Sequence, residues 1–350
     1  MFAMTRTRLL VATVILVPAF AALLAFAVFS SSANATHSWN GYHWARTSNP
    51  FTLKLGDNVS SAWDSYLCTI VGKSIPAGTA ANGDCGSASN SVNNWDSSQP
   101  AYSTYRDELN PQVVAGGINP KKCSPKSGQV EVCNARYGKN GWLGLASIWI
   151  DSNNHITQGT TKLNDSYYTT GSKYDTPGWR NLVVCQEVGH TFGLDHQDEN
   201  FDNTNLGTCM DYASNPLGPP DNEYPNQGDY DQLTCIYDAD PATKGKTLST
   251  DTHSCTVTGH TDSSSTISAN AASKHPAAMN AMDTSNPKEW GKLVQKKGRY
   301  EVYERDFGGG NKVRTWVIKA DGTDVAPEGT TRPEATTRPE TTAPVSTPTT

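Results

Sequence analysis

A short stretch in the middle of the 350-residue chain defines one helix and the turn that ends it. Thr176-Pro177 is typical of a helix start, with Thr as the N-cap and Pro at the first helical position. The helix is expected to run from about residue 177 to residue 191 and to stop near Gly193, because glycine permits the left-handed turn that ends a helix. Four residues of this stretch follow the spacing E-x-x-H-x-x-G-x-x-H: Glu187, His190, Gly193 and His196.

On such a helix, Gln186 and His190 lie one turn apart on the same face, so both side chains can reach one point. Glu187 lies about 100° further round and can reach the edge of that point. The turn at Gly193 would swing His196 back toward it as a third group. Side chains that converge on one point in this way predict a metal site, with Glu187 beside it but not a ligand.

The segment resembles the metzincin zinc peptidases, whose signature H-E-x-x-H-x-x-G-x-x-H is followed by a Met-turn. The sequence 209–212, Cys-Met-Asp-Tyr, stands in the Met-turn position. The resemblance implies that the chain hydrolyses peptide bonds of protein or peptide substrates by zinc-activated water. It also implies a role for each residue of the motif: zinc ligands at His190, His196 and Gln186, a general base at Glu187, Met210 beneath the metal, and Tyr212 stabilising the transition state.

The same resemblance implies an α+β fold, with a twisted and mostly parallel sheet, an antiparallel edge strand, the active-site helix and the Met-turn. The nearly continuous apolar run 142–150 resembles the family's edge strand, which aligns peptide substrates by β-pairing. A turn at 151–154 and a return strand at 155–159 follow it. Residues 228–237 resemble the closing helix. The resemblance covers residues 140–240 well and residues 37–139 only vaguely.

The sequence departs from the signature at its first histidine, which is Gln186. A neutral amide oxygen is a poor zinc ligand compared with imidazole. In one interpretation Gln186 coordinates weakly and the site still works. In the other, the site has lost its metal, and the chain is an impaired pseudoprotease that serves as an extracellular binding module. The retained Glu187 favours the enzyme, since a binding module has no need of a general base.

Residues 1–35 have the pattern of a secretory signal peptide. Arg6 and Arg8 precede an apolar run over 9–29, and Ala33 and Ala35 form a cleavage site before Thr36. The alternative is an uncleaved membrane anchor, since about 20 apolar residues span a bilayer. In both cases the rest of the chain is outside the cell, and after cleavage no membrane contact is expected. The net charge of −6 gives no reason to bind nucleic acid.

Composition divides the remainder into a peptidase domain over 36–240, a linker over 241–285, a small β unit over 286–326 and a tail over 327–350. In the β unit, residues 299–307 and 312–318 flank a glycine-rich turn and predict a hairpin. It is too small to be stable alone and is expected to pack on the main domain. The Thr/Pro-rich tail cannot form a core; it is expected to be disordered and would suit association with a cell envelope. The protein is expected to be a monomer.

Eight cysteines suit four disulfides in an exported protein. Eight cysteines allow 105 pairings, and sequence proximity suggests the following: Cys68–Cys85, Cys123–Cys133, Cys185–Cys209 and Cys235–Cys255. The third pair would clamp the candidate helix to the Met-turn.

The loop 198–205 has enough oxygen atoms for a structural calcium ion. It lacks the regular spacing and the glycine of an EF-hand, so a polar connecting loop is the favoured interpretation. Histidines outside the motif are given structural roles: His43 and His155 are expected to pack, and His275 is expected to be solvated.

Overall fold

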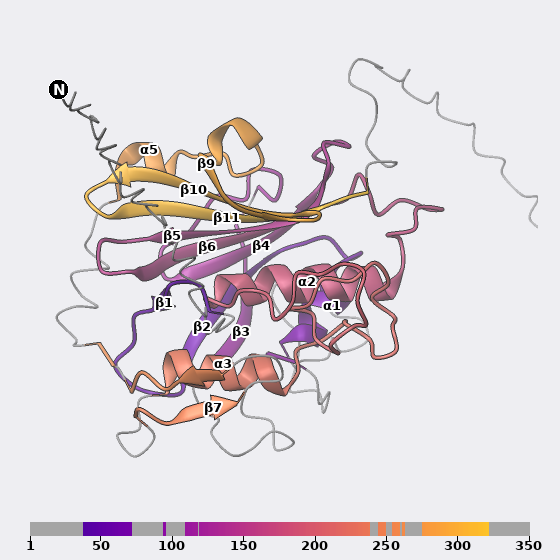
Figure 1. The fold of residues 1–350 in the computed structure, drawn as a ribbon. Helices are drawn as coiled ribbons and strands as arrows, with labels where there is room; N and C mark the ends of the chain where they lie inside the picture. The colour runs from indigo at the N-terminus through magenta and orange to yellow at the C-terminus, as the bar shows by residue number, and fades with distance from the viewer. Residues whose placement is uncertain are drawn as a thin grey trace, which may run out of the picture. The chain divides into compact units, whose positions relative to one another are not determined.

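The computed structural model describes residues 38–71, 94–95, 109–117, 119–238, 244–249, 254–259, 261–262 and 275–321. The predicted signal peptide and the predicted tail lie outside these residues. The described part is α+β, with helices packed against a mixed and mostly parallel sheet (Figure 1), which confirms the general fold class. None of the helices described is long and apolar enough to cross a membrane.

Eight strands follow one another across the main sheet, and a ninth pairs at its side. Their order is β3 (Leu109–Ala115), β2 (Phe51–Asn58), β4 (Gln129–Ala135), β6 (His155–Asn164), β5 (Trp142–Ile150), β11 (Asn311–Lys319), β10 (Tyr300–Gly308) and β9 (Lys292–Lys297). Strands β2, β3, β4 and β6 pair in parallel, and the pairs from β6 through β5 to β9 are antiparallel. The ninth strand, β1 (His43–Trp44), pairs in parallel with the start of β6.

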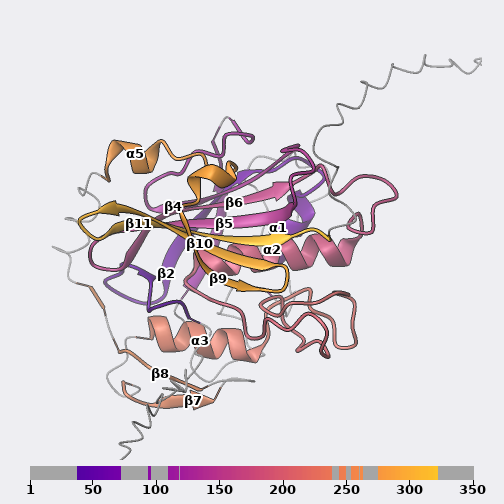
Figure 2. The ribbon, with the colours of Figure 1, turned by 45° about the horizontal axis from the view of Figure 1, so that its top comes forward.

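Strand β5 is an interior strand of this sheet, between β6 and β11 (Figure 2). β11 pairs with it along its length, from Lys312 opposite Ile150 to Lys319 opposite Trp142. The bounds of the strand are as predicted, but the expectation of a free edge at 142–150 is wrong. All nine of its residues are buried, and such an unbroken apolar run is typical of a strand that is covered on both faces.

Helix α2 (Pro177–Thr191) packs against β5 and β6 and has the predicted start and end. The Thr176 hydroxyl accepts a hydrogen bond from the Trp179 backbone N–H, and Pro177 occupies the first turn. At the other end Gly193 has φ +96°, and a Cβ there would collide with the carbonyl oxygen of Tyr42. Only glycine fits this turn.

The main core lies between the sheet and three helices: α2, α1 (Asp64–Ile70) and α3 (Gln227–Tyr237). α3 matches the predicted closing helix over 228–237.

The opposite face of β5 and β11 is covered by residues that the composition assigned to the linker and the small β unit. A second core cluster joins the two strands to this cover: Trp142, Leu145, Trp149, Val313, Val317, Met279, Met282 and Trp290. The cover includes α5 (Ala277–Asn280) and a 3₁₀ turn, Pro287–Glu289. Within the predicted linker, β7 (Thr247–Ser249) also pairs with β8 (Ser254–Thr256). The sequence 241–285 therefore contributes regular structure and core residues.

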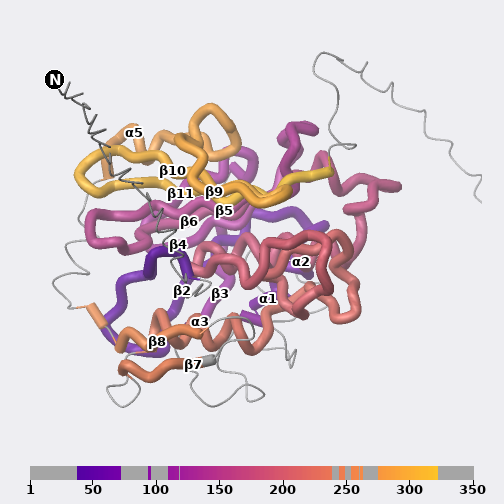
Figure 3. The backbone as a smooth tube through the Cα atoms, in the orientation of Figure 1, coloured from indigo at the N-terminus to yellow at the C-terminus, as the bar shows by residue number. Residues whose placement is uncertain are grey.

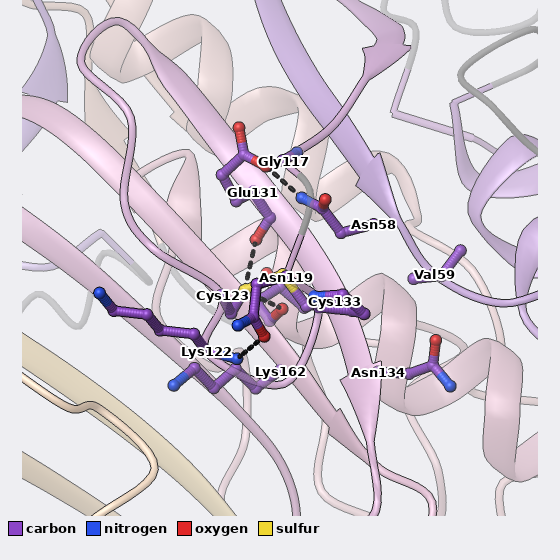
Figure 4. The surroundings of a disulfide bond; sticks show 12 residues. Asn58, Val59, Gly117, Asn119, Lys122, Cys123, Glu131, Cys133, Asn134 and Lys162 are labelled. Carbon is purple, nitrogen blue, oxygen red and sulfur yellow. Dashed lines mark hydrogen bonds between the residues drawn. A yellow bond between two sulfur atoms is a disulfide. The ribbon is translucent and has the colours of Figure 1, made fainter.

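Three of the predicted disulfides are present: Cys123–Cys133, Cys185–Cys209 and Cys235–Cys255. Cys85, the predicted partner of Cys68, lies outside the described residues. Figure 4 shows Cys123–Cys133 beside the buried Glu131, whose carboxylate accepts hydrogen bonds from the Asn58 amide and the Gly117 N–H. Structural disulfides are typical of oxidising compartments, so these bonds support the predicted export.

Candidate functional site

The structure brings together the two histidines of the motif. The rings of His190 and His196 meet edge to face, with centroids 4.6 Å apart and planes at 85°. His190 Nδ1 lies 2.9 Å from the carbonyl oxygen of Leu194. Metal-binding histidines commonly donate one ring N–H to a carbonyl or carboxylate and bind the metal through the other nitrogen. His190 is therefore oriented as a zinc ligand would be, and two imidazoles are a donor set that suits zinc.

Gln186 is buried one turn before His190, and its amide joins helix α2 to the Met-turn. The amide nitrogen donates to the carbonyl oxygen of Cys209 at 2.8 Å and to that of Asp211 at 3.5 Å. Because the nitrogen is held by this backbone, the amide oxygen is the one atom of Gln186 available to a metal. This link has no signal in the sequence, since it depends on which loop lies opposite the helix.

Glu187 is buried against strand β5. A Cβ added at Gly144 would lie 3.1 Å from both Cγ and Oε1 of Glu187, so the glycine allows β5 to approach the carboxyl group closely. Burial raises the pKa of Glu187 well above its usual value, and burial lowers the pKa of His190 to about 3. The predicted general base thus lies beside the strand that was expected to align the substrate.

Two carboxylates that the motif did not indicate lie next to His196. Asp195, His196 and Glu199 each place one ligand atom within 4.8 Å of the others. Asp195 Oδ1 accepts from the His196 N–H at 2.9 Å, and Glu199 Oε2 lies 2.5 Å from Lys297 Nζ. Burial raises the pKa of Asp195 to about 7. Asp195 adjoins the motif in sequence, but the approach of Glu199 depends on the fold of the loop.

The loop 198–205, weighed above as a calcium site, closes on itself by hydrogen bonds. Asp198 accepts from the Asn200 N–H at 2.9 Å and from the side-chain amide of Asn203. The interpretation of residues 198–205 as a polar connecting loop stays a prediction.

Two residues of the predicted Met-turn, Met210 and Tyr212, lie close to the end of helix α2 and to His196. A Cβ at Gly189 would be 2.6 Å from Met210 Sδ, so Met210 packs against helix α2 at Gly189. The ring of Tyr212 meets that of His196 with centroids 5.0 Å apart. The Tyr212 hydroxyl donates to the carbonyl oxygen of Arg299 at 3.4 Å, in the turn between β9 and β10.

Strands β10 and β11, here called the C-terminal hairpin (residues 300–319), cover the candidate site. Trp316 stacks on His190 with centroids 5.0 Å apart and planes at 7°, and the Tyr300 ring lies 4.1 Å from that of His196. Figure 3 shows the hairpin against β5, from which it is far in sequence. Gln186, Glu187, His190 and His196 are each at most 5% exposed. Motif analysis missed Tyr300 and Trp316; their aromatic character within the predicted hairpin was the only signal.

Comparisons of the chain with protein-family models, with curated proteins and with solved structures found no match. The likeness to the metzincins stays a prediction, which depends on the residues between Gln186 and Tyr212.

Replacing Gln186 with His is expected to tighten zinc binding by about 10–100-fold, since an imidazole is a better zinc ligand than an amide. The zinc dissociation constant is measured by competition with a chromophoric chelator. Gln158→His, on β6 where the amide bonds Asn280, is the matched control and should leave the affinity unchanged. Equal affinities for Gln186→His and wild type would show that position 186 is not a ligand position.

Proposed function

We propose that the protein is an exported zinc-dependent endopeptidase whose active site is covered by its own C-terminal hairpin. The observation that carries the proposal is the edge-to-face pair of His190 and His196 at the end of helix α2. Glu187 lies on the same helix beside β5, and Met210 packs beneath it. The disulfides and the N-terminal sequence pattern support export.

His190 and His196 would hold the zinc ion, with Gln186 as a weaker third ligand. When bound, zinc supplies the Lewis acidity that activates water for attack on a peptide carbonyl. Glu187 would accept a proton from the attacking water and pass it to the leaving amine. The Tyr212 hydroxyl would donate a hydrogen bond to the developing oxyanion.

The C-terminal hairpin makes the contacts that a bound peptide would make in such a site. β11 lies antiparallel along β5, and the Arg299 carbonyl accepts the hydrogen bond of Tyr212. The Tyr300 ring fills the space next to His196. The hairpin is braced by Arg314, whose guanidinium lies 2.5 Å from Glu304 and 4.0 Å from the ring centre of Trp39. Substrate would therefore enter only after the hairpin moves away from β5.

Weakening the hairpin is expected to increase cleavage of an unfolded protein substrate at least tenfold. Trp316→Ala removes a buried aromatic side chain, a change that typically costs about 3–5 kcal/mol, and so favours the open arrangement. Arg314→Ala breaks the brace at a different residue and serves if Trp316→Ala fails to fold. Cleavage of reduced, alkylated casein is followed with zinc and then with a chelator. Phe307→Ala, on β10 away from the histidines, is the control.

If none of these variants shows chelator-sensitive cleavage, the enzyme proposal is overturned.

A second candidate function is a peptide-binding module. One observation favours it: the Gln186 amide nitrogen donates a hydrogen bond to the Cys209 carbonyl, a structural role that needs no metal. In that case the variants with a weakened hairpin would bind the unfolded substrate and leave it intact.

A further inference from the structure

A second group of metal-binding side chains lies outside the candidate active site. His43 is on β1, His155 begins β6, and Asp262 belongs to the short segment 261–262. One ligand atom from each lies within 4.8 Å of the others. His155 and Asp262 are buried, and His43 is half-buried. We propose that these three residues form a divalent metal site, with zinc as the ion that fits best.

Both histidines are oriented as metal ligands are. His43 Nδ1 lies 2.7 Å from the carbonyl oxygen of Gly41, and His155 Nδ1 lies 3.6 Å from Asp151 Oδ2. With Nδ1 turned to a backbone or carboxylate acceptor, Nε2 is the ring atom through which each histidine would bind a metal. Asp151 is fixed in turn, because its Oδ1 accepts the N–H groups of Asn153 and His155 at 2.8 and 3.0 Å.

The carboxylate of the group is held in place by backbone bonds. Asp262 Oδ2 accepts from the Arg46 N–H at 2.9 Å, and the Asp262 N–H donates to the Arg46 carbonyl at 2.7 Å. Asp262 Oδ1 then lies 3.0 Å from His155 Nε2. Two imidazoles and one carboxylate are a recurrent zinc ligand set that leaves one position open. His43 also borders a cavity of about 200 Å³, lined by Ser38 and Gln232 among others, from which water can complete the coordination.

The position of the group gives the metal a structural role. The N-terminal segment 38–46 packs on the turn that ends helix α2: Trp44 Nε1 donates to the Thr191 carbonyl at 2.8 Å, and the Trp39 N–H donates to the Gly193 carbonyl at 3.2 Å. An ion on His43, His155 and Asp262 would fasten this segment to β6. It would thereby stabilise the turn that leads to His196.

The test counts zinc ions on the full chain. Zinc-free protein is titrated with Zn²⁺ against a chromophoric chelator, and two equivalents are expected in the wild type. His43→Gln and Asp262→Asn, both conservative, should each lose one equivalent and at least half of the rise in Tm that zinc produces. His275→Gln is the matched control: this half-buried ring contacts Thr157 near His155 but lies outside the group. Co²⁺ absorption should show a tetrahedral site that His43→Gln removes.

A parallel variant, His190→Gln, separates this proposal from the proposed function. It should lose the other equivalent and keep the one at His43. If His43→Gln and Asp262→Asn bind zinc with wild-type stoichiometry and affinity, the second metal site is overturned, and His155 is only hydrogen-bonded between two carboxylates. If His190→Gln changes nothing while His43→Gln loses an ion, the second site stands and the peptidase site fails.

Discussion

Glu187→Gln is expected to reduce chelator-sensitive peptide cleavage by about 10²–10⁴-fold, which is the usual contribution of a general base. The amide has nearly the shape of the carboxyl group, so its packing against Gly144 is kept. Zinc affinity should be unchanged, because Glu187 is not among the proposed ligands.

The comparison is best made in the Trp316→Ala background, in which cleavage is expected to be faster. kcat/KM is measured on a quenched fluorescent peptide, and zinc affinity on the same samples by chelator competition. Glu223→Gln is the control, since Glu223 accepts a hydrogen bond from Asn181 on helix α2 and belongs to no proposed step. Equal rates for Glu187→Gln and its parent would rule out the mechanism, whatever the zinc content.

Removing the Cys185–Cys209 disulfide is expected to lower both the free energy of unfolding and the affinity for zinc. Its cysteines are 24 residues apart, and the chain-entropy relation gives a loss of about 3.5 kcal/mol for a loop of that size. The bond also joins the residue before Gln186 to the residue before Met210. The double variant Cys185→Ala/Cys209→Ala should therefore bind zinc about 10–100-fold more weakly as well, an effect typical of supporting contacts around a metal.

The chain offers a matched control in Cys235–Cys255, whose cysteines are 20 residues apart. Its removal should cost nearly the same free energy of unfolding, about 3.3 kcal/mol, and leave zinc affinity at His190 and His196 unchanged. Urea denaturation gives the two stabilities, and chelator competition gives the two affinities. If both double variants bind zinc equally well, the clamp contributes to stability alone.

The parts of the fold that were predicted correctly are those with local signals. Thr176 and Pro177 mark the start of helix α2, and Gly193 marks its end. The glycine-rich turn marks the C-terminal hairpin. Sequence proximity was enough for the three disulfides described.

The errors concern contacts between distant segments. The pattern of 142–150 shows a buried strand, but no local feature shows that β11 is its neighbour. An unbroken apolar run argues against a free edge, and this signal was available in the sequence. Two further contacts depend on the tertiary fold and have no signal in the spacing of the residues. One is the group of His43, His155 and Asp262, and the other is the hydrogen bond from Gln186 to Cys209.

The pairing of β5 with β11 also sets an order of events during synthesis. β5 ends at Ile150, and its partner begins at Asn311, 161 positions later. At about 5–20 residues per second, a ribosome needs about 10–30 s to cover that distance. Throughout this interval the β11-facing edge of β5 has no partner from its own chain, and an unpaired apolar strand is prone to aggregate. The nascent chain therefore passes through a vulnerable stage, which ends only when its last strands arrive.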